Sequence, residues 1–383
     1  MYKAGQLAAT LARTANGGTE FHYRPEYLAE HGAPIATTLP QSTEPIYCAA
    51  GSIPPFFEGL LPEGHRLTAL RRAVKTSADD ELSLLLAVGV DAPGDVQVVP
   101  TNCPLVETAA LIEGDTPSDL DFARLVDKVD PHALPGVQRK ASASMISVPL
   151  SAQYGRFILK LSPLEYPHLV ENEAAHLQAA KLLKLPVAVA SLVTDRTGES
   201  GLLVRRFDRV PTDDSWLRLA FEDATQILGL PPAAKYRTDA VSLVSALAQF
   251  TDAPLVATRN AYLQFLFAWL TGNGDLHAKN IGLLEDRGGR WHVAPIYDIP
   301  STLIYEDDSM ALPIAGRTRK LRGRDWIAFA AEIGLPDRAA ASARQLALRA
   351  ATAISYTELP FAGSPLHRVE RELRWRRREL ESK

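Results

Sequence analysis

Three polar residues near position 280 are suited to binding a divalent cation. Asp275 and Asn280 lie five residues apart in the segment GNGDLHAKN, and Asp298 follows Asn280 by 18 residues in the segment YDIPST. Mg²⁺ prefers such hard oxygen ligands, takes one or two carboxylates from a protein, and fills its shell with water and phosphate oxygens. The three side chains therefore predict a magnesium site, provided that the fold brings them together.

The segments that flank the sequence EDRGGR can bring them together. IGLL at 281–284 and WHVAPI at 291–296 are apolar strand candidates, and the paired glycines between them indicate a hairpin. Since a hairpin returns the chain to its starting point, we expect Asn280, before the first strand, to lie beside Asp298, after the second. The alternative is an Asx-rich turn with solvated carboxylates.

The order Asp, Asn, Asp is that of a phosphoryl-transfer centre. In protein kinases one Asp accepts the proton of the substrate hydroxyl, while the Asn and the second Asp bind metal. Such chemistry also needs a cation on the phosphates, and Lys160 in the strand candidate FILKL (157–161) is suited to that role. Its expected partners are Glu171 and Glu173, at the start of a helix predicted for 171–185. The alternative is a snorkelling lysine on an edge strand.

A second phosphate contact is expected upstream, in the segment LPGVQRKASAS at 134–144. It combines one glycine with two adjacent cations, Arg139 and Lys140. Exposed backbone N–H groups in such a loop can hold phosphates. One glycine in a basic segment is equally typical of a plain turn, so the residues alone leave both assignments open.

The elements that must position these residues divide the chain into a mixed first part and a helical second part. The 383 residues predict two to three domains. Helical character at 65–90 is followed by a strand candidate at 96–100, and a hairpin is predicted for 191–207; beyond 215 the pattern is mainly helical. We therefore predict an α+β, bilobed architecture with a cleft between the lobes. The predicted domains are 1–118, 119–209 and 210–383.

Composition excludes several classes of protein. Hydrophobic residues make up 46% of the chain and charged residues 22%, which excludes a chain that is disordered throughout. The net charge of -4 argues against a protein whose whole surface binds nucleic acid. The two cysteines, Cys48 and Cys103, form no metal-binding pattern and fit a reducing compartment. Because we find neither a signal peptide nor the ~18 apolar residues of a membrane span, we expect a cytoplasmic protein with no membrane partner.

These segments resemble the HipA-like serine/threonine kinases, the toxin components of bacterial toxin–antitoxin pairs. The matching segments are FFEGLLPEG (56–64), PGVQRK (135–140), FILK (157–160), ENE (171–173), RRFDR (205–209), EDATQILGLPPAAKY (222–236), GNGDLHAKN (272–280) and YDIPST (297–302). The resemblance implies a protein-kinase-like fold with a β-containing N-terminal lobe, an extra N-terminal subdomain and a mainly helical C-terminal lobe. It also implies ATP and Mg²⁺ as cofactors, and transfer of the γ-phosphoryl group to a protein hydroxyl.

The resemblance assigns a role to each matching residue. Asp275 looks like the proton acceptor, and Asn280 and Asp298 look like the Mg²⁺ ligands. The implied phosphate loop consists of Pro135, Gly136, Val137, Gln138, Arg139 and Lys140, and Lys160 looks like the lysine that contacts phosphate. Arg205 and Phe207 look like the hinge between the lobes. The other implied nucleotide-binding residues are His277, Lys279 and Tyr297. His277 also fits a buried histidine whose ring is satisfied by protein partners.

One position departs from the family pattern. The residue three before the loop glycine is commonly a serine whose autophosphorylation silences the kinase, and here it is Ala133. Alanine cannot accept phosphate. Either this protein lacks that brake or a serine has been replaced.

The resemblance further implies partners. These are a helix-turn-helix antitoxin, operator DNA reached only through that antitoxin, and a protein substrate such as an aminoacyl-tRNA synthetase. The C-terminal stretch 366–383, with seven Lys or Arg and four Glu, predicts a solvated helix or a patch that faces the antitoxin or DNA. Two other functions stay open: a small-molecule phosphotransferase of the aminoglycoside or choline kinase type, and a non-catalytic partner of a DNA-binding antitoxin.

Overall fold

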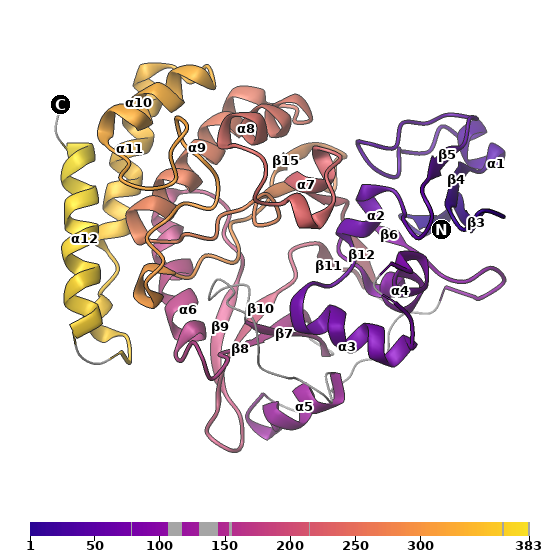
Figure 1. The fold of residues 1–383 in the computed structure, drawn as a ribbon, viewed down its shortest axis with the longest axis horizontal. Coiled ribbons are helices and arrows are strands. Elements are labelled where there is room, and N and C mark those ends of the chain that lie inside the picture. Colours follow the sequence, from indigo (N-terminus) through magenta and orange to yellow (C-terminus); the bar gives the residue numbers. More distant parts are fainter. Residues whose placement is uncertain are drawn as a thin grey trace.

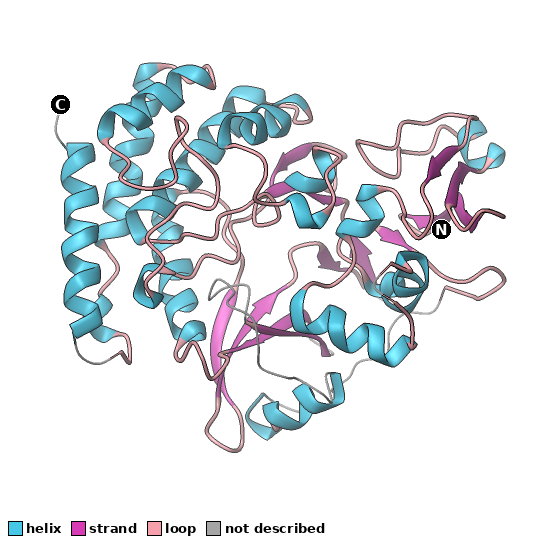
Figure 2. Cartoon of the chain, in the orientation of Figure 1, coloured by secondary structure: helices cyan, strands magenta, loops and turns pink. Residues whose placement is uncertain are grey.

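Three parts of the chain are visible in the computed structural model (Figure 1). It describes residues 1–77, 79–105, 117–129, 145–152, 155–213, 215–361 and 364–381. An N-terminal subdomain (residues 1–105) lies on the right, a strand-rich lobe lies at the bottom, and a helical lobe fills the left and the top. Figure 2 shows that the long helices gather in the last of these parts. The predicted α+β division into unlike lobes is confirmed.

The N-terminal subdomain combines two small antiparallel sheets with short helices. The first sheet has the order β2 (Gln6–Leu7), β1 (Tyr2–Lys3), β6 (Val96–Gln97), and the second the order β3 (Ala9–Arg13), β4 (Thr19–Tyr23), β5 (Ile46–Cys48). The helices are α1 (Pro25–Ala29), α2 (Pro55–Gly59), α3 (Gly64–Val74) and α4 (Glu81–Val88). Phe21 and Phe57 are fully buried where α2 meets the second sheet, with their ring centroids 5.7 Å apart.

The helical segment predicted at 65–90 is two helices. Lys75 adopts a left-handed conformation with φ of 56° and ends α3, and Asp80 accepts a hydrogen bond from the Ser83 N–H at the start of α4. A left-handed residue and a polar cap are the ordinary end and start signals of helices. The strand predicted at 96–100 is shorter than expected, since only Val96 and Gln97 pair with β1.

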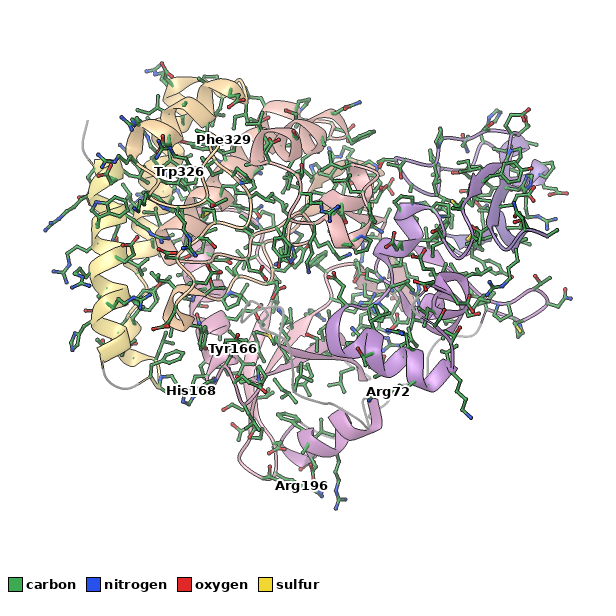
Figure 3. All side chains as sticks on the ribbon, viewed as in Figure 1. Arg72, Tyr166, His168, Arg196, Trp326 and Phe329 are labelled. Carbon is green, nitrogen blue, oxygen red and sulfur yellow. The ribbon has the colours of Figure 1, made fainter. Side chains whose placement is uncertain are left out.

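The strand-rich lobe is an antiparallel sheet of order β7 (Ile146–Ala152), β8 (Gly155–Leu161), β10 (Ser200–Arg205), β9 (Ala190–Thr194). Alternation along β8 sends Leu159 and Leu161 into a cluster with Phe122 of α5 (Phe122–Val129). The hairpin predicted at 191–207 is confirmed by β9 and β10, and Arg196 lies at its tip (Figure 3).

Helix α6 (Leu169–Ala180) belongs to the same lobe and contacts the sheet. The helix predicted over 171–185 is confirmed in type, but its last turn, Lys181–Leu183, is a 3-10 helix that ends at Lys184, which is left-handed with φ of 58°. Other single 3-10 turns in the described chain are Gly89–Asp91, Pro117–Asp119, Pro232–Ala234, Leu303–Tyr305 and Tyr356–Glu358.

The helical lobe is built around α9 (Pro254–Thr271), which is buried continuously from residue 261 to residue 271. It packs against α8 (Ala240–Gln249), α11 (Asp337–Thr352) and α12 (Ser364–Glu381), and its Tyr262 meets Trp326 and Phe329 of α10 (Gly323–Glu332) (Figures 1 and 3). A helix that is apolar on all sides is expected at the centre of a lobe. No helix among the described residues is long and apolar enough to cross a lipid bilayer.

A small sheet carries the predicted hairpin at 281–297. Strands β14 (Gly282–Glu285) and β15 (Trp291–Val293) pair antiparallel, as predicted, and Leu283 lies opposite Val293. A third strand, β13 (Phe221–Asp223), pairs on the other side of β14 and was not predicted, because three residues are too few to show alternation. β13 leads directly into α7 (Ala224–Ile227).

Buried polar contacts attach the N-terminal subdomain to the rest of the chain. Both oxygens of Glu222 accept hydrogen bonds from Thr37, at 2.9 Å from its N–H and 2.7 Å from its hydroxyl. Asp208 accepts from the Gly94 N–H of the subdomain at 2.9 Å and also pairs with Arg206 and Arg209, at 2.9 and 2.7 Å. It lies just before β11 (Arg209–Pro211), which pairs with β12 (Trp216–Arg218). Burial alone would raise the pKa of Asp208, but the two guanidinium groups outweigh it and lower that pKa.

Candidate active site

The loop that carries Asp275 begins at a helix end that only glycine fits well. Gly272 ends α9 in the left-handed region, with φ of 72°, and its N–H bonds back to the carbonyls of Ala268 and Trp269. A Cβ at this position would lie 2.6 Å from the Cβ of Leu303, so the 301–303 segment packs directly on the turn. This glycine C-cap sets the direction in which the loop leaves the helix.

Asp275 is buried and held from several sides. Its N–H donates to Asn273 Oδ1 at 2.8 Å, and its Oδ1 accepts from the Tyr236 hydroxyl at 2.7 Å. Its backbone carbonyl accepts from the Asn280 side chain at 2.9 Å. Because Asn280 uses its amide nitrogen in this way, its Oδ1 is the atom suited to bind a cation.

Lys160 is the centre of a buried cluster of charges. Its Nζ lies 2.7 and 2.9 Å from the two oxygens of Glu173 and 2.9 Å from Asp298 Oδ1. The alternative of a snorkelling lysine is wrong, because β8 is an inner strand and the side chain is buried. The expected pairing with α6 is confirmed through Glu173, whereas Glu171 approaches His168 at 4.0 Å.

The electrostatics of this cluster follow from its geometry. Burial alone would lower the pKa of Lys160, but the carboxylates of Asp298 and Glu173 outweigh it and raise the pKa. Burial opposes ionisation of Asp298 as well, yet the Lys160 ammonium holds the pKa of Asp298 below its usual value. Lys160 and Asp298 are therefore both charged in the folded protein.

The hairpin brings the neighbours of Asn280 and Asp298 into direct contact. The Tyr297 hydroxyl donates to the Lys279 carbonyl at 2.6 Å, so the residue before Asp298 is bonded to the residue before Asn280. Asp298 itself is left-handed, with φ of 55°, a conformation that Asp enters more readily than most residues. The prediction that the hairpin joins these two segments is confirmed.

A further contact joins α6 to the segment after Asp298 and was not predicted. The Asn172 side chain donates to the Ser301 carbonyl and accepts from the Ser301 N–H, both at 2.9 Å. Next to it, the Thr302 hydroxyl accepts from the Gly274 N–H at 2.8 Å. The strand-rich lobe and the loop with Asp275 are thus tied together by way of residues 301 and 302.

The predicted nucleotide-binding residues differ in their surroundings. The rings of Phe207 and Tyr297 pack together with their centroids 5.6 Å apart, in a cluster with Phe221. Arg205, in contrast, is exposed. Lys279 is partly buried and donates to the Gly59 carbonyl and to Asp223, so its charge points toward α2. The predicted phosphate loop, 135–140, and Ala133 lie outside the described residues.

His277 is a buried ring with protein partners. Its Nδ1 accepts a hydrogen bond from the Lys279 N–H at 3.2 Å, and its Nε2 lies 3.9 Å from Asp275 Oδ2. The centroid of its ring lies 5.0 Å from that of the Tyr236 ring. Burial, helped by Lys235, lowers the pKa of His277 to about 3, so the ring is neutral. These contacts agree with the interpretation of His277 as a buried histidine whose ring has protein partners. A role of His277 in nucleotide binding stays a prediction.

The donor set fits a magnesium ion bound together with phosphate. Asp298 supplies a carboxylate and Asn280 an amide oxygen from segments that the hairpin joins. Within the described ranges no three His, Cys, Asp or Glu side chains converge on one point. A metal held by Asn280 and Asp298 would therefore complete its shell with phosphate oxygens and water, as Mg²⁺ does at kinase sites.

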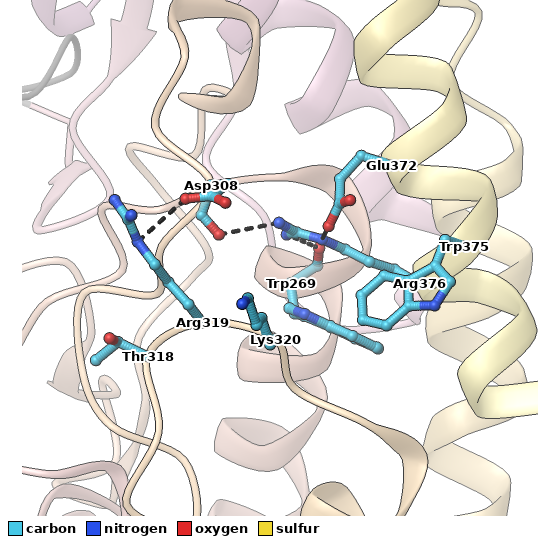
Figure 4. Close-up of a pocket in the computed structure, with 8 residues that line it drawn as sticks. All are labelled: Trp269, Asp308, Thr318, Arg319, Lys320, Glu372, Trp375 and Arg376. Carbon is cyan, nitrogen blue, oxygen red and sulfur yellow. Dashed lines mark hydrogen bonds and ion pairs between the residues drawn. The ribbon is translucent and has the colours of Figure 1, made fainter.

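A separate pocket of about 270 Å³ lies in the helical lobe (Figure 4). It opens between α9, the 318–320 segment and α12, and it is lined by Trp269, Asp308, Thr318, Arg319, Lys320, Glu372, Trp375 and Arg376. The cations Arg319 and Arg376 are each paired, with Asp308 at 3.1 Å and Glu372 at 2.9 Å. None of the predicted site residues lines it.

Family models match most of the chain. The HipA N-terminal domain matches residues 1–99, and the HipA-like C-terminal domain matches residues 132–354. The second match includes Lys160, Asp275, Asn280 and Asp298.

Individual relatives agree with this result. Y4mE of Sinorhizobium fredii, provisionally named a kinase, is 29% identical over 364 residues, which are 87% of this chain and 85% of that protein. The serine/threonine-protein kinase toxin HipA of Shewanella oneidensis is 27% identical over 321 residues, 77% of this chain and 72% of that protein. A solved structure of the Shewanella oneidensis MR-1 toxin–antitoxin system HipA, HipB and its operator DNA aligns over 99% of this chain and 96% of that chain, with 22% identity and a TM-score of 0.78. The bilobed, protein-kinase-like fold predicted from the sequence is thereby confirmed.

Proposed function

The chain belongs to the family of HipA-like kinases, and on that premise we propose that it is an ATP-dependent protein serine/threonine kinase, the toxin of a toxin–antitoxin pair. The observation that carries the proposal is the contact of Lys160 with both Glu173 and Asp298, beside the loop that holds Asp275 and Asn280. A strand lysine, a helix glutamate and a metal-binding aspartate in this arrangement are the parts that position ATP in kinases.

Each residue then has a defined task. Asn280 and Asp298 would hold Mg²⁺, and Lys160 would bind phosphate oxygens while Glu173 keeps its ammonium in place. Bound Mg²⁺ and ATP would supply charge neutralisation and the phosphoryl group. Asp275, fixed by Tyr236 and Asn273, would accept the proton of the incoming hydroxyl, the task of a general base within hydrogen-bond reach.

Partners and substrate are proposed by analogy with relatives. The structure of the Shewanella oneidensis protein contains HipA, HipB and operator DNA. By analogy we propose that this chain binds a helix-turn-helix antitoxin, which contacts operator DNA. The family resemblance supports a protein of translation as the acceptor, an aminoacyl-tRNA synthetase being our first candidate.

The experiment is to incubate the chain with [γ-³²P]ATP, Mg²⁺ and a bacterial lysate, and to identify the labelled proteins by mass spectrometry. We expect Mg²⁺-dependent labelling of a serine or threonine in one or a few proteins, and at least about 100-fold less label when Asp275→Ala replaces the wild type. Label that enters only small molecules such as choline or an aminoglycoside would contradict the proposal in favour of a small-molecule kinase. No transfer at all would favour a non-catalytic antitoxin partner.

A further inference from the structure

Tyr236 makes a direct hydrogen bond to the side chain that is proposed to act as the base. Its hydroxyl donates to Asp275 Oδ1 at 2.7 Å, and its ring packs edge-on against His277. Burial and the nearby Asp275 carboxylate raise the pKa of Tyr236, so the hydroxyl keeps its proton and remains a donor. One oxygen of Asp275 is therefore held in place, and the bond restricts rotation of the carboxylate.

The residue before Tyr236 connects this bond to the N-terminal subdomain. Lys235 accepts a backbone hydrogen bond from Ala278 in the loop, at 3.2 Å, and its ammonium lies 5.4 Å from the centre of the Tyr236 ring. The same ammonium lies 3.2 Å from the carboxylate of Glu63. Glu63, Lys235 and Tyr236 thus form a continuous chain of contacts that ends at Asp275.

A second contact from the same segment of the subdomain reaches the same loop. The Gly59 carbonyl, at the end of α2, accepts from the partly buried ammonium of Lys279 at 2.9 Å. Gly59 lies so close to α7 that a Cβ would meet Gln226 Cγ at 2.6 Å, while Gln226 also donates to the Phe56 carbonyl at 2.8 Å. Residues 56–63 therefore contact both α7 and the loop that carries Asp275.

We propose that Tyr236 is a positioning residue for Asp275, and that residues 56–63 of the N-terminal subdomain fix its place through the Glu63–Lys235 contact. This inference rests on the proposed kinase function. It makes the subdomain a part of the catalytic unit, because the carboxylate that accepts the proton is oriented by a tyrosine that the subdomain supports. Orientation of this kind acts on the chemical step more than on nucleotide binding.

The first test compares Tyr236→Phe with wild type by initial rates of ³²P transfer from [γ-³²P]ATP into lysate protein. Loss of a hydrogen bond to a charged group predicts a roughly 10- to 100-fold lower rate at saturating ATP. The ATP concentration for half-maximal rate and the affinity for the ATP analogue AMP-PNP with Mg²⁺ should be unchanged. The matched control is Tyr262→Phe, which removes a hydroxyl bonded to the Trp326 carbonyl in the helical lobe and should leave the rate unchanged.

The second test asks whether the subdomain acts through Tyr236. Glu63→Gln removes a partly exposed ion pair and should lower the rate about two- to fivefold. The double variant with Tyr236→Phe should be no slower than Tyr236→Phe alone, because both changes interrupt one chain of contacts. Glu26→Gln, which removes an exposed ion pair of α1 with Arg24, is the control for Glu63→Gln.

Three results would overturn the inference. A Tyr236→Phe protein as fast as wild type would show that the hydroxyl does not position Asp275. Rate losses that multiply in the double variant would show that Glu63 acts elsewhere. A wild-type chain that transfers no phosphoryl group would overturn the proposed function together with this inference, whereas the first two results leave the proposed function intact.

Discussion

The ammonium of Lys160, on the inner strand β8, lies 2.9 Å from Oδ1 of Asp298, although 138 residues separate the two along the chain. The pair joins the strand-rich lobe to the segment that follows the β14–β15 hairpin. Glu173 shares the same ammonium, so one buried cation balances two carboxylates. The cluster is therefore sensitive to any change that removes the cation.

The first prediction follows from this balance. Lys160→Met should lower the free energy of unfolding by about 3 kcal/mol, because it leaves two carboxylates with no cation in a largely buried place. Adding Glu173→Gln to Lys160→Met should restore part of the loss, since only one uncompensated charge then remains. Thermal melts of the single and double variants provide the measurement. A Lys160→Met protein that melts like wild type would show that the cluster does not stabilise the fold.

The second prediction concerns Asp275. Asp275→Ala should reduce phosphoryl transfer about 10²- to 10⁴-fold, the range for loss of a positioned general base. Binding of AMP-PNP with Mg²⁺ should persist, because Lys160, Asn280 and Asp298 remain. Rates of ³²P transfer and calorimetric titration measure the two quantities. Asp213→Ala, at an exposed position of the linker after β11, is the control, and equal rates for both variants would show that Asp275 is only a turn residue.

Much of this site could be predicted because its parts lie on elements with strong local signals. The apolar strand around Lys160, the helix at 171–185 and the hairpin after Asn280 each have a clear pattern and were found. The choice between Glu171 and Glu173 was not settled, because two residues along a helix differ by about 200° and the answer depends on where the sheet lies. Only the fold shows that Glu173 faces β8.

Contacts between segments far apart in the chain could not be predicted from the sequence. Tyr236 and Asp275 are 39 residues apart, and no periodicity connects them. The sequence predicted roles for Glu171 and Glu173 but none for Asn172, which lies between them. It is Asn172 that forms hydrogen bonds with Ser301. The family resemblance implied a nucleotide contact for Lys279. Its contact with Gly59 depends on the packing of the N-terminal subdomain, which no local sequence pattern indicates.

The third prediction is a dependence of stability on pH that arises from His176. This ring is fully buried in α6, with Nδ1 2.7 Å from the Asn172 carbonyl and Nε2 3.1 Å from the Tyr356 hydroxyl. Burial lowers the pKa of His176 to about 4, below the value of about 6.5 expected in the unfolded chain. Between these values the unfolded chain binds the extra proton, so the stability present above pH 6.5 is lost as the pH falls toward 4.

From pH 6.5 to pH 5 this one group should lower the free energy of unfolding by about 2 kcal/mol. Melting temperatures of wild type and His176→Gln at pH 7, 6 and 5 provide the measurement, and the variant should show the smaller decrease. His367→Gln, at an exposed position of α12, is the control and should follow the wild type. Parallel curves for wild type and His176→Gln would contradict the assignment.

The last prediction tests how the loop with Asp275 is held. Gly274 donates to the Thr302 hydroxyl at 2.8 Å, and a Cβ at this position would lie 2.5 Å from the Ser309 carbonyl oxygen and 2.6 Å from the Thr302 hydroxyl oxygen. Gly274→Ala must therefore displace the loop from residues 302–309. Because a displacement of about 1 Å can cost a catalytic group about 100-fold in rate, we expect ³²P transfer to fall about 10- to 100-fold.

Gly288→Ala is the matched control for Gly274→Ala. It places the same methyl group at the exposed tip of the β14–β15 hairpin, where the nearest atom is the flexible carboxylate of Asp286 at 3.1 Å. Its rate should stay within about twofold of wild type, since surface changes of this kind cost about 0.5 kcal/mol or less. Equal rates for Gly274→Ala and Gly288→Ala would show that the tight packing of residues 302–309 does not set the position of Asp275, and that Tyr236 and Asn273 hold it without that support.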